Sequence, residues 1–540
     1  MSASANIAGA LEARAAADPA RKALILPDGT ELSFAELERA ASRRARALAA
    51  AGIGRGARAA LMVPPGLEFF ALAFALFKLG AIPVFIDPGM GRAGLSRCLD
   101  DAAPEAFIGI PLAHAARVVL GWARRSLRVR VTVGPRLFWG GASLARLVAA
   151  ADEAPRPAEA LGADEPAAIL FTSGSTGPAK GALYTHGNFQ AQIEALRALF
   201  GIGPGEVDLP TFPLFALFAP ALGMTSVLPE MDFTRPGSVD PESIVGPVQG
   251  RGVHQLFGSP ALLDRVGRWA EGQDVRLESL RRVVSAGAPV APKILERFAK
   301  LLPEGCAIHT PYGATEALPV ACIDSREILS ETWRGTAEGR GVCVGRPVPG
   351  VRVDVLKVSD EPVPEWSEDL RAAPGEIGEF VVRGPAVTRE YFNRPEATAL
   401  AKVRFPDGTV GHRMGDVGRV DEAGRLWFCG RKSQRVETEA GTLYTIPCEG
   451  VFNRHPKARR TALVGVGPAP RQTPVLVVEP EEGVEPDEAL KEELRGLGAG
   501  FGHTRTVRVM LFHPSFPVDI RHNAKIFREK LAVWAASQLS

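Results

Sequence analysis

The stretch FTSGSTGPAKGA, from Phe171 to Ala182, decides the fold of this chain. It follows an apolar run, 167–170, that indicates a buried strand, and it precedes a helix-like stretch at 188–200. Glycines let backbone N–H groups approach an anion, hydroxyls donate hydrogen bonds, and a following helix directs its positive end at such a loop. Lys180 is followed by glycine, so this is not the Gly-Lys-Ser/Thr type of phosphate loop. The stretch predicts another kind of phosphate site, set between a strand and a helix.

Length and composition favour a multi-domain cytoplasmic protein. The chain has 540 residues, of which 46% are hydrophobic and 23% charged, and its formal net charge is +2, so no nucleic-acid partner is indicated. The arginines at 124, 125, 128 and 130 fit a strand with one solvated face. The cysteines form no C-x-x-C pair, which favours reduced thiols. No signal peptide is evident, and the apolar runs 69–77 and 212–228 fit core elements instead of membrane spans.

Alternating strand-like and helix-like stretches predict an α/β fold with largely parallel sheets. Strand-like runs occur at 59–63, 83–86 and 106–110. After residue 345, short alternating segments indicate a small antiparallel unit. We therefore expect a large N-terminal domain, residues 1–430, with two parallel-type α/β subdomains and a small β-rich subdomain. A small α/β C-terminal domain, residues 431–540, follows it.

A second signal is PYGATE at 311–316, where a hydroxyl and a carboxylate share one tight turn. Such a turn can hold a phosphate and Mg²⁺, which prefers hard oxygen ligands. Three further segments are informative in combination: SAGAP at 285–289, MGD at 414–416 and PVDIRHNAKIFREKL at 517–531. A carboxylate such as that of Asp416 can accept hydrogen bonds from two vicinal hydroxyls.

Taken in order, these motifs resemble the adenylate-forming superfamily, which contains acyl- and aryl-CoA synthetases, luciferases and the adenylation domains of peptide synthetases. The resemblance covers nearly the whole chain and implies ATP and Mg²⁺ as cofactors. The nucleotide-binding residues that it implies are Thr172, Ser173, Gly174, Ser175, Thr176, Gly177, Lys180, Gly287, Ala288, Pro289, Tyr312, Gly313, Asp416 and Arg431. The implied catalytic residues are Thr315, Glu316 and Lys525, and the implied metal ligands are Glu316 and Thr176.

The resemblance also implies a role for each motif. Tyr312 stacks on adenine, while Asp416 and Arg431 reach the ribose. Thr315 binds phosphate. Lys525, carried by a mobile C-terminal domain, bridges the substrate carboxylate and the α-phosphate, where negative charge develops. The segment around Tyr391 resembles a structural signature, and we assign it to the scaffold.

Three departures from the superfamily pattern narrow the prediction. Ala216 stands where histidine is frequent, and Ser433 replaces the usual hinge aspartate. Glu437 replaces a lysine in a segment that is one residue longer before Gly441. In CoA ligases this segment lines the pantetheine tunnel, so the change disfavours formation of a CoA thioester.

The strings at 211–218, 309–319 and 516–525 resemble one subgroup, the β-lactone synthetases of bacterial long-chain olefin biosynthesis. The resemblance implies an ATP-dependent β-lactone synthetase that acts on a long-chain 2-alkyl-3-hydroxyalkanoic acid. The substrate's own 3-hydroxyl attacks the acyl-adenylate, releasing AMP after pyrophosphate. Candidates for the base that accepts the hydroxyl proton are His309, His412 and His522, because a histidine ordinarily titrates near neutral pH. The sequence does not distinguish among the three.

Three alternatives stay open: a long-chain acyl-CoA ligase, an acyl-AMP ligase that loads a carrier protein, and a non-catalytic nucleotide- or lipid-binding scaffold. Retention of the predicted catalytic and nucleotide-binding residues argues against the last. In the resembled pathway the enzyme works beside a condensing enzyme, a ketoreductase and a decarboxylating hydrolase. The sequence leaves open whether these form an assembly, the oligomeric state, and the length and stereochemistry of the alkyl arms.

Overall fold

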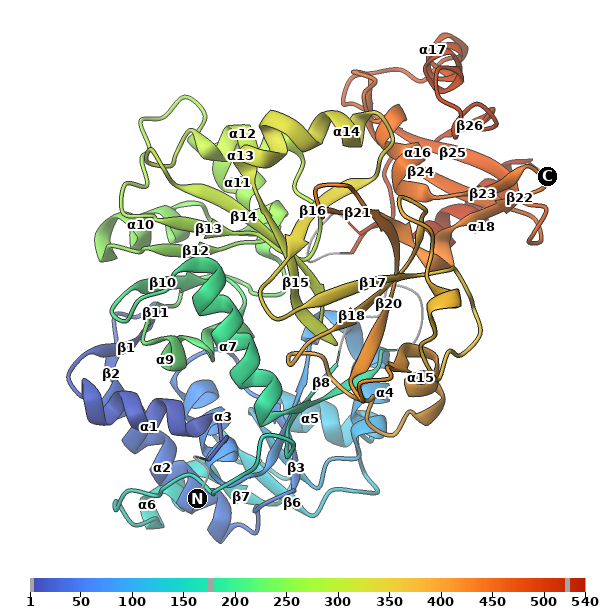
Figure 1. The fold of residues 1–540 in the computed structure, drawn as a ribbon. Helices are drawn as coiled ribbons and strands as arrows, with labels where there is room; N and C mark the ends of the chain where they lie inside the picture. The colour runs from blue at the N-terminus through green and yellow to red at the C-terminus, as the bar shows by residue number, and fades with distance from the viewer. Residues whose placement is uncertain (1–3, 172–178, 520–524, 540) are drawn as a thin grey trace.

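The computed structural model describes residues 4–171, 179–519 and 525–539. Within these residues the strands form a seven-stranded sheet, a 14-stranded sheet, and a two-stranded and a three-stranded sheet near the C-terminus. The C-terminal elements, orange to red in Figure 1, gather as a small unit beside the larger remainder of the chain. The predicted class, a large N-terminal α/β domain followed by a small α/β domain, is confirmed.

The seven-stranded sheet has the strand order β7-β6-β5-β3-β4-β8-β9, and all its neighbours run parallel except β8 and β9. Its strands are β3 (Arg58–Met62), β4 (Ile82–Ile86), β5 (Ala106–Gly109), β6 (Val129–Thr132), β7 (Ala142–Ser143), β8 (Pro166–Phe171) and β9 (Gly181–Thr185). The helices of this part are α1 (Ala8–Ala17), α2 (Phe34–Ala50), α3 (Leu67–Lys78), α4 (Gly91–Ala102), α5 (Pro111–Leu120) and α6 (Leu144–Ala150).

The strand predicted at 167–170 and the helix predicted at 188–200 are confirmed, but the prediction that the helix follows the loop directly is wrong. After β8 the chain forms a second strand, β9, antiparallel to it, and Phe171 pairs with Gly181 while Pro166 pairs with Thr185. Helix α7 (His186–Phe200) begins only after β9, where Thr185 accepts a hydrogen bond from the backbone N–H of Asn188. The start of α7 therefore lies at the end of the β8–β9 pair opposite to Phe171 and Gly181.

The second sheet begins with parallel strands in the order β14-β13-β12-β10-β11-β1, and β2 pairs antiparallel with β1. These strands are β1 (Lys22–Ile25), β2 (Glu31–Ser33), β10 (Val207–Pro210), β11 (Thr225–Val227), β12 (Gln255–Phe257), β13 (Arg282–Val284) and β14 (Ala307–Ala314). The accompanying helices are α8 (Pro213–Ala216), α9 (Ala219–Leu222), α10 (Glu242–Arg251), α11 (Pro260–Ala270) and α12 (Pro292–Ala299).

At β14 the sheet changes from parallel to antiparallel. A turn at Thr315 and Glu316 leads into β15, which returns along β14. The antiparallel part continues the same hydrogen-bonded sheet, so the predicted β-rich unit shares an edge with the parallel strands. Its strands are β15 (Ala317–Asp324), β16 (Val342–Pro347), β17 (Arg352–Leu356), β18 (Gly378–Arg383), β19 (Lys402–Arg404), β20 (Val410–Val420) and β21 (Leu426–Arg431). Its helices are α13 (Ser325–Glu327), α14 (Trp333–Ala337) and α15 (Pro395–Ala401).

The last strand of the 14-stranded sheet, β21, ends at Arg431, and the later strands belong to the small sheets. We therefore propose that the C-terminal domain begins at residue 431. Its strands are β22 (Val436–Thr438), β23 (Gly441–Leu443), β24 (Ala458–Val466), β25 (Thr473–Pro480) and β26 (Val509–Phe512). Its helices are α16 (Thr445–Phe452), α17 (Glu488–Ala499) and α18 (Arg528–Leu539).

Helix α3 forms the centre of the N-terminal core. Ten consecutive residues, 69–78, are buried, because residues 69–77 are all apolar and so leave the helix no polar side there. That residue, Lys78, is fully buried, and its ammonium group pairs with Glu12 and, at 2.8 Å, with Glu38. It also donates a 2.7 Å hydrogen bond to the carbonyl of Arg156. A buried charge is tolerated here because several oxygens surround it.

We expect Lys78→Met to destabilise the N-terminal domain by about 1–3 kcal/mol, because it leaves the partly buried carboxylates of Glu12 and Glu38 without their buried partner. Urea unfolding followed by tryptophan fluorescence measures this loss. The matched control is Lys293→Met, since Lys293 is exposed and pairs with Glu481 at 3.4 Å on the surface. The control should change stability by less than about 1 kcal/mol, and equal losses in both variants would contradict the prediction.

Candidate active site

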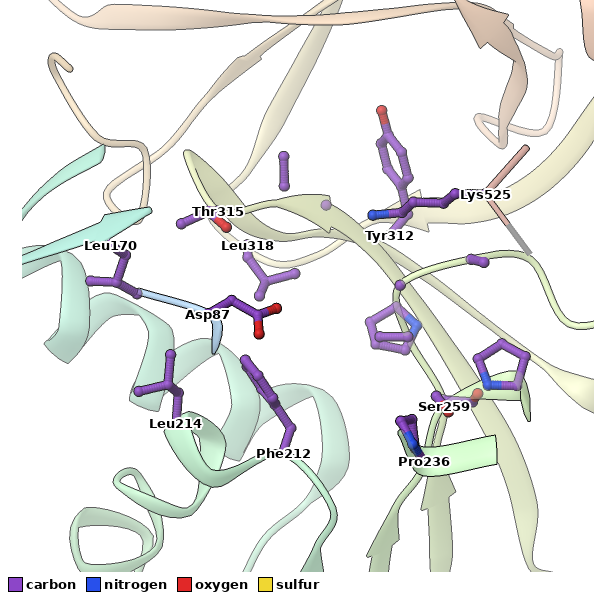
Figure 2. A pocket seen from close by; sticks show the side chains of 18 of the residues that line it. Asp87, Leu170, Phe212, Leu214, Pro236, Ser259, Tyr312, Thr315, Leu318 and Lys525 are labelled. Atoms are coloured by element: carbon purple, nitrogen blue, oxygen red, sulfur yellow. The ribbon is translucent and has the colours of Figure 1, made fainter. Parts of the chain in front are cut away.

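One cavity of about 1920 Å³ lies where the strands β8 and β14 end, and it extends to the C-terminal domain. Figure 2 shows side chains from widely separated parts of the sequence, among them Asp87, Tyr312 and Lys525, around this space. Every predicted site residue that the structure describes lines the cavity. These residues are Lys180, Gly287, Ala288, Pro289, Tyr312, Gly313, Thr315, Glu316, Asp416, Arg431 and Lys525. The remaining predicted site residues, Thr172, Ser173, Gly174, Ser175, Thr176 and Gly177, lie outside the described residues.

Asp416, Tyr312 and Arg431 form a cluster on three strands of the large sheet, in which Asp416 is buried and the other two are partly exposed. Asp416 on β20 lies opposite Arg431 on β21, and their side chains pair at 2.9 Å. The hydroxyl of Tyr312, on β14, donates a 2.6 Å hydrogen bond to the other carboxylate oxygen. Burial raises the pKa of Asp416, an effect that the charge of Arg431 opposes, and Asp416 in turn raises the pKa of Arg431. The cluster thus presents a carboxylate and a guanidinium group to the cavity.

Glu316 is held in place at the turn between β14 and β15. Its side chain is nearly buried, and the hydroxyl of Tyr391 donates a 2.6 Å hydrogen bond to its carboxylate. Its carbonyl accepts a 2.9 Å hydrogen bond from the backbone N–H of Thr388. The neighbouring Thr315 carbonyl accepts a hydrogen bond from the hydroxyl of Tyr184. Contacts on both sides of the turn therefore fix the direction of the Glu316 carboxylate.

Two lysines lie close to this carboxylate. The ammonium group of Lys180 lies 5.1 Å from the centre of the Tyr391 ring, and that of Lys402 lies 5.9 Å from it. Lys402 is buried and donates hydrogen bonds to the carbonyl and hydroxyl of Thr388. Burial lowers the pKa of Lys402 to about 7, against a partial opposing effect of Glu316. Excess positive charge thus surrounds one carboxylate.

Lys525 reaches the cavity from the C-terminal domain. Its backbone N–H donates a 2.9 Å hydrogen bond to the side chain of Asp519, and its carbonyl accepts one of 3.0 Å from the Asp519 N–H. The charge of Lys525 acts on Asp416, and Figure 2 shows the Lys525 side chain beside Tyr312. The C-terminal lysine and the nucleotide-type cluster therefore meet in one site, although more than a hundred residues separate Asp416 from Lys525.

The rest of the cavity is predominantly apolar. Aromatic side chains line it from several elements: Phe69, Phe85, Phe189, Phe212, Phe215, Phe218 and Phe257. Figure 2 shows Phe212 and Leu214 on one side of this region and Leu318 above it, with Asp87 pointing between them. The cavity volume is roughly twice the upper end of about 1,000 Å³ for ordinary small-molecule sites. It suits a ligand with both a highly charged part and a large apolar part.

Of the departures noted in the sequence, only one faces the cavity. Ser433 lines it, whereas Ala216 is buried in the core of the N-terminal domain. Glu437 lies on β22, where its carboxylate pairs with Arg435 at 3.1 Å. Among the candidate bases, His412 lines the cavity, while His309 packs its ring edge-on against Phe200; His522 lies outside the described residues.

The sequence reasoning missed three residues of the site. Tyr391 was assigned to the scaffold, yet its hydroxyl binds the Glu316 carboxylate. Lys402 and Tyr184 carry no motif, and they reach the site only through the pairing of distant strands. The one signal for Tyr391 in the sequence is its place in the segment YFN at 391–393, which resembles a structural signature of the superfamily.

Comparison with known proteins agrees with this geometry. Residues 11–392 match the family model of the AMP-binding enzymes, and the chain belongs to this family. It is accordingly an ATP-dependent adenylate-forming ligase. It is 52% identical over 512 residues to the olefin beta-lactone synthetase of Stenotrophomonas maltophilia, covering 94% of this chain and 92% of that one. It is 50% identical over 549 residues to the olefin beta-lactone synthetase of Xanthomonas campestris pv. campestris, covering 99% and 98%.

Among solved structures, the chain is similar to the amide bond synthetase McbA from Marinactinospora thermotolerans. The TM-score is 0.79 at 25% identity, and the alignment covers 98% of this chain and 99% of that one. The shared fold, with a large N-terminal and a small C-terminal domain, agrees with the sheets described above.

The depressed pKa of Lys402 predicts a specific dependence of stability on pH. The folded protein has a pKa of about 7 at this lysine, against an ordinary value of 10.5. Between these values the unfolded chain binds one more proton, so this lysine makes stability rise with pH in that window; below pH 7 its penalty is fully present.

Lys402→Met removes this titration. We expect the difference in free energy of unfolding, variant minus wild type, to be greatest at about pH 6 and to decrease toward about pH 9, by at most about 1.4 kcal/mol per pH unit. Thermal unfolding in chelator-containing buffers measures it, with the exposed Lys293→Met as control. A difference that stays constant across this range would show that Lys402 titrates normally.

Proposed function

We propose that this protein is a β-lactone synthetase that converts a long-chain 2-alkyl-3-hydroxyalkanoic acid, with ATP, to a β-lactone, AMP and pyrophosphate. The observation that carries the proposal is the single cavity, in which the Asp416–Arg431–Lys525 end is continuous with a large apolar region. The chain is also 52% and 50% identical in sequence, over nearly its full length, to two proteins named olefin beta-lactone synthetase, which supports the same conclusion.

In the first step, the substrate carboxylate attacks the α-phosphate of ATP and expels pyrophosphate. Asp416 and Arg431 hold the ribose, and Tyr312 packs on the adenine. Lys525 supplies positive charge between the attacking carboxylate and the α-phosphate, where negative charge accumulates in the transition state. Lys180 and Lys402 add positive charge beside the phosphates, since both lie near the Tyr391 ring and Glu316.

The donor set fits Mg²⁺. Glu316 offers a fixed, nearly buried carboxylate, and hard oxygen ligands of this kind are what Mg²⁺ takes in nucleotide sites. Glu316 and Thr176 would hold the ion, which neutralises phosphate charge when bound. Thr315 lies on the same turn and is positioned to hydrogen-bond a phosphate oxygen. Tyr391 acts as a positioning residue through its hydrogen bond to Glu316.

In the second step, the substrate's own 3-hydroxyl attacks the acyl carbon, the bond to AMP breaks, and a four-membered lactone closes. A strained ring requires an activated acyl group, which the adenylate provides. The nucleophile is intramolecular, and well-oriented internal attack contributes roughly 7–11 kcal/mol toward lowering the barrier. No second substrate is needed, which agrees with Glu437 replacing the lysine that CoA ligases have in the segment lining their pantetheine tunnel. Of the described candidate bases, His412 is the one that lines the cavity.

The reaction places the protein in the cytoplasm, where ATP is available and thiols stay reduced; all six cysteines are free in the structure. A condensing enzyme and a ketoreductase supply the 2-alkyl-3-hydroxy acid. A decarboxylating hydrolase consumes the lactone.

Lys525→Ala should reduce substrate-dependent ATP–pyrophosphate exchange by at least about a hundredfold, because the transition state loses a charge that no other group replaces. The melting temperature should stay within about 2 °C of wild type, since a half-buried terminal lysine contributes little to stability. The matched control is Lys530→Ala, at a position five residues further along, which should exchange normally. Near-normal exchange in the Lys525 variant would remove this residue from the mechanism.

Product analysis distinguishes lactone closure from its alternatives. With a 2-alkyl-3-hydroxy acid, ATP and Mg²⁺, we expect AMP and lactone without CoA, at a rate that added CoA does not change. An analogue without the 3-hydroxyl should stop at the acyl-adenylate, because its internal nucleophile is missing. Mass spectrometry of the acyl product provides the measurement. An acyl-CoA as main product, or AMP release that requires CoA, would replace this proposal with an acyl-CoA ligase.

A further inference from the structure

Helix α5 (Pro111–Leu120) has its polar residues inside and its apolar residues outside. His114 and Arg117 are buried, whereas Leu112 is 74% exposed and Val119 is 81% exposed. Val118 and Leu120 are also exposed. A surface helix of a soluble protein ordinarily shows the opposite arrangement, so this orientation needs a physical cause.

Specific contacts of the two buried polar residues fix this orientation. A ring nitrogen of His114 hydrogen-bonds with the carbonyl of Val131 at 3.0 Å, and its ring stacks on Trp139 with the centres 5.6 Å apart. The guanidinium group of Arg117 lies over the ring of Phe107, 5.8 Å from its centre. Rotating α5 to hide its apolar side would break all of these contacts.

The exposed apolar surface extends beyond the helix into the loop between β6 and β7. Phe138 is 80% exposed and packs edge-on against Trp139, which also stacks on His114. Leu137 is exposed beside it. We name the apolar patch by its six members, Leu112, Val118, Val119, Leu120, Leu137 and Phe138. Exposed apolar side chains on a helix and on the loop that packs against it through Trp139 indicate an interaction site.

The sequence around the apolar patch is strongly basic. Residues 106–151 contain no aspartate or glutamate and seven arginines: Arg117, Arg124, Arg125, Arg128, Arg130, Arg136 and Arg146. Of these, Arg124 and Arg125 follow α5 directly and are exposed, and Arg136 precedes Leu137 and is exposed as well. The surroundings of the patch are therefore electrically complementary to an anionic surface.

The apolar patch is also a wall of the cavity. Leu112, Val119 and Leu120 line the cavity, together with Arg92 at the start of α4. Their side chains are at once solvent-exposed and cavity-lining, so this side of the cavity opens to the exterior across α5. A ligand that enters here passes directly from the apolar patch into the apolar region of the site.

We propose that the apolar patch and its arginines dock on an anionic lipid bilayer, from which the two-armed acid passes into the cavity. An apolar helix face with basic flanks is the arrangement of proteins that lie on a membrane. None of the helices in the described parts of the chain is long and apolar enough to span one. Docking on the bilayer is inferred from the apolar patch and its arginines alone, whereas the passage of the acid into the cavity depends also on the proposed function. Long alkyl arms keep such an acid in the bilayer, so a site that opens at its surface avoids transfer through water.

The experiment is vesicle co-sedimentation of the full chain without ATP or substrate. Wild type should bind vesicles of phosphatidylcholine with phosphatidylglycerol, and less at high salt. The variant Leu112→Ser/Val119→Ser/Phe138→Ser should bind about tenfold or more weakly, since each change removes exposed apolar surface that the bilayer would cover. The matched control is Val533→Ser on α18, whose side chain is 74% exposed away from the patch.

Charge is tested separately. Arg124→Glu/Arg125→Glu should lose the preference for phosphatidylglycerol over phosphatidylcholine alone, whereas Arg471→Glu, on the exposed turn between β24 and β25, should keep it. Equal melting temperatures show that the variants are folded. If wild type does not bind these vesicles, or if the triple variant binds as well as wild type, the proposal is wrong. If the protein instead self-associates through the patch and does not bind vesicles, the patch is an interface with a second copy of the chain.

Entry of the substrate has its own readout. For an acid embedded in vesicles, the variant Val118→Ser/Leu137→Ser/Phe138→Ser, which changes only patch members that do not line the cavity, should raise the apparent KM about tenfold. For a short-armed acid in solution, the kcat/KM of this variant should match wild type. Failure of lactone formation with both substrates would count against the proposed function, whereas unchanged vesicle kinetics alone would overturn substrate entry through the patch.

Discussion

The interaction on which the site depends is the ion pair between the buried Asp416 and the partly exposed Arg431, completed by the hydroxyl of Tyr312. These two partners compensate the charge of a buried carboxylate and connect three strands. Tyr312 comes from the last parallel strand, while Asp416 and Arg431 come from antiparallel strands. The hydrogen bond from Tyr312 to Asp416 thus links the parallel and the antiparallel part of the sheet at the place where the cavity forms.

The turn at Thr315 and Glu316 depends on this junction. Because β15 reverses the direction of β14, the turn projects from the edge where the parallel strands end. Around it lie the cations Lys180, Arg431 and Lys525, which line the cavity, and the buried Lys402. A site with several cations before its ligand arrives is suited to a polyphosphate and a second carboxylate, whereas the depressed pKa of Lys402 is caused mainly by burial.

The opposite side of the cavity follows a different constraint. Buried polar contacts of His114 and Arg117 turn the apolar face of α5 outward, so the same helix forms part of the cavity wall and part of the protein surface. The charged end of the cavity is thus closed in by strands, whereas its apolar end is open. This asymmetry matches a substrate whose carboxylate reacts and whose alkyl arms remain associated with lipid.

The sequence by itself determined the order of the motifs, the α/β alternation, the change to antiparallel strands and the residues at the nucleotide end, because each rests on local patterns of residue type and spacing. Only the tertiary structure decided that β9 separates the loop from α7, since a five-residue apolar run fits a strand or a helix equally. It also brought Tyr391 to Glu316, 75 positions away, and Lys402 into the same interior. Finally, only the tertiary structure shows that α5 buries its polar side and exposes its apolar side. Periodicity shows that a helix has two faces, but which face is buried depends on partners such as Val131, Trp139 and Phe107, which only folding brings to the helix.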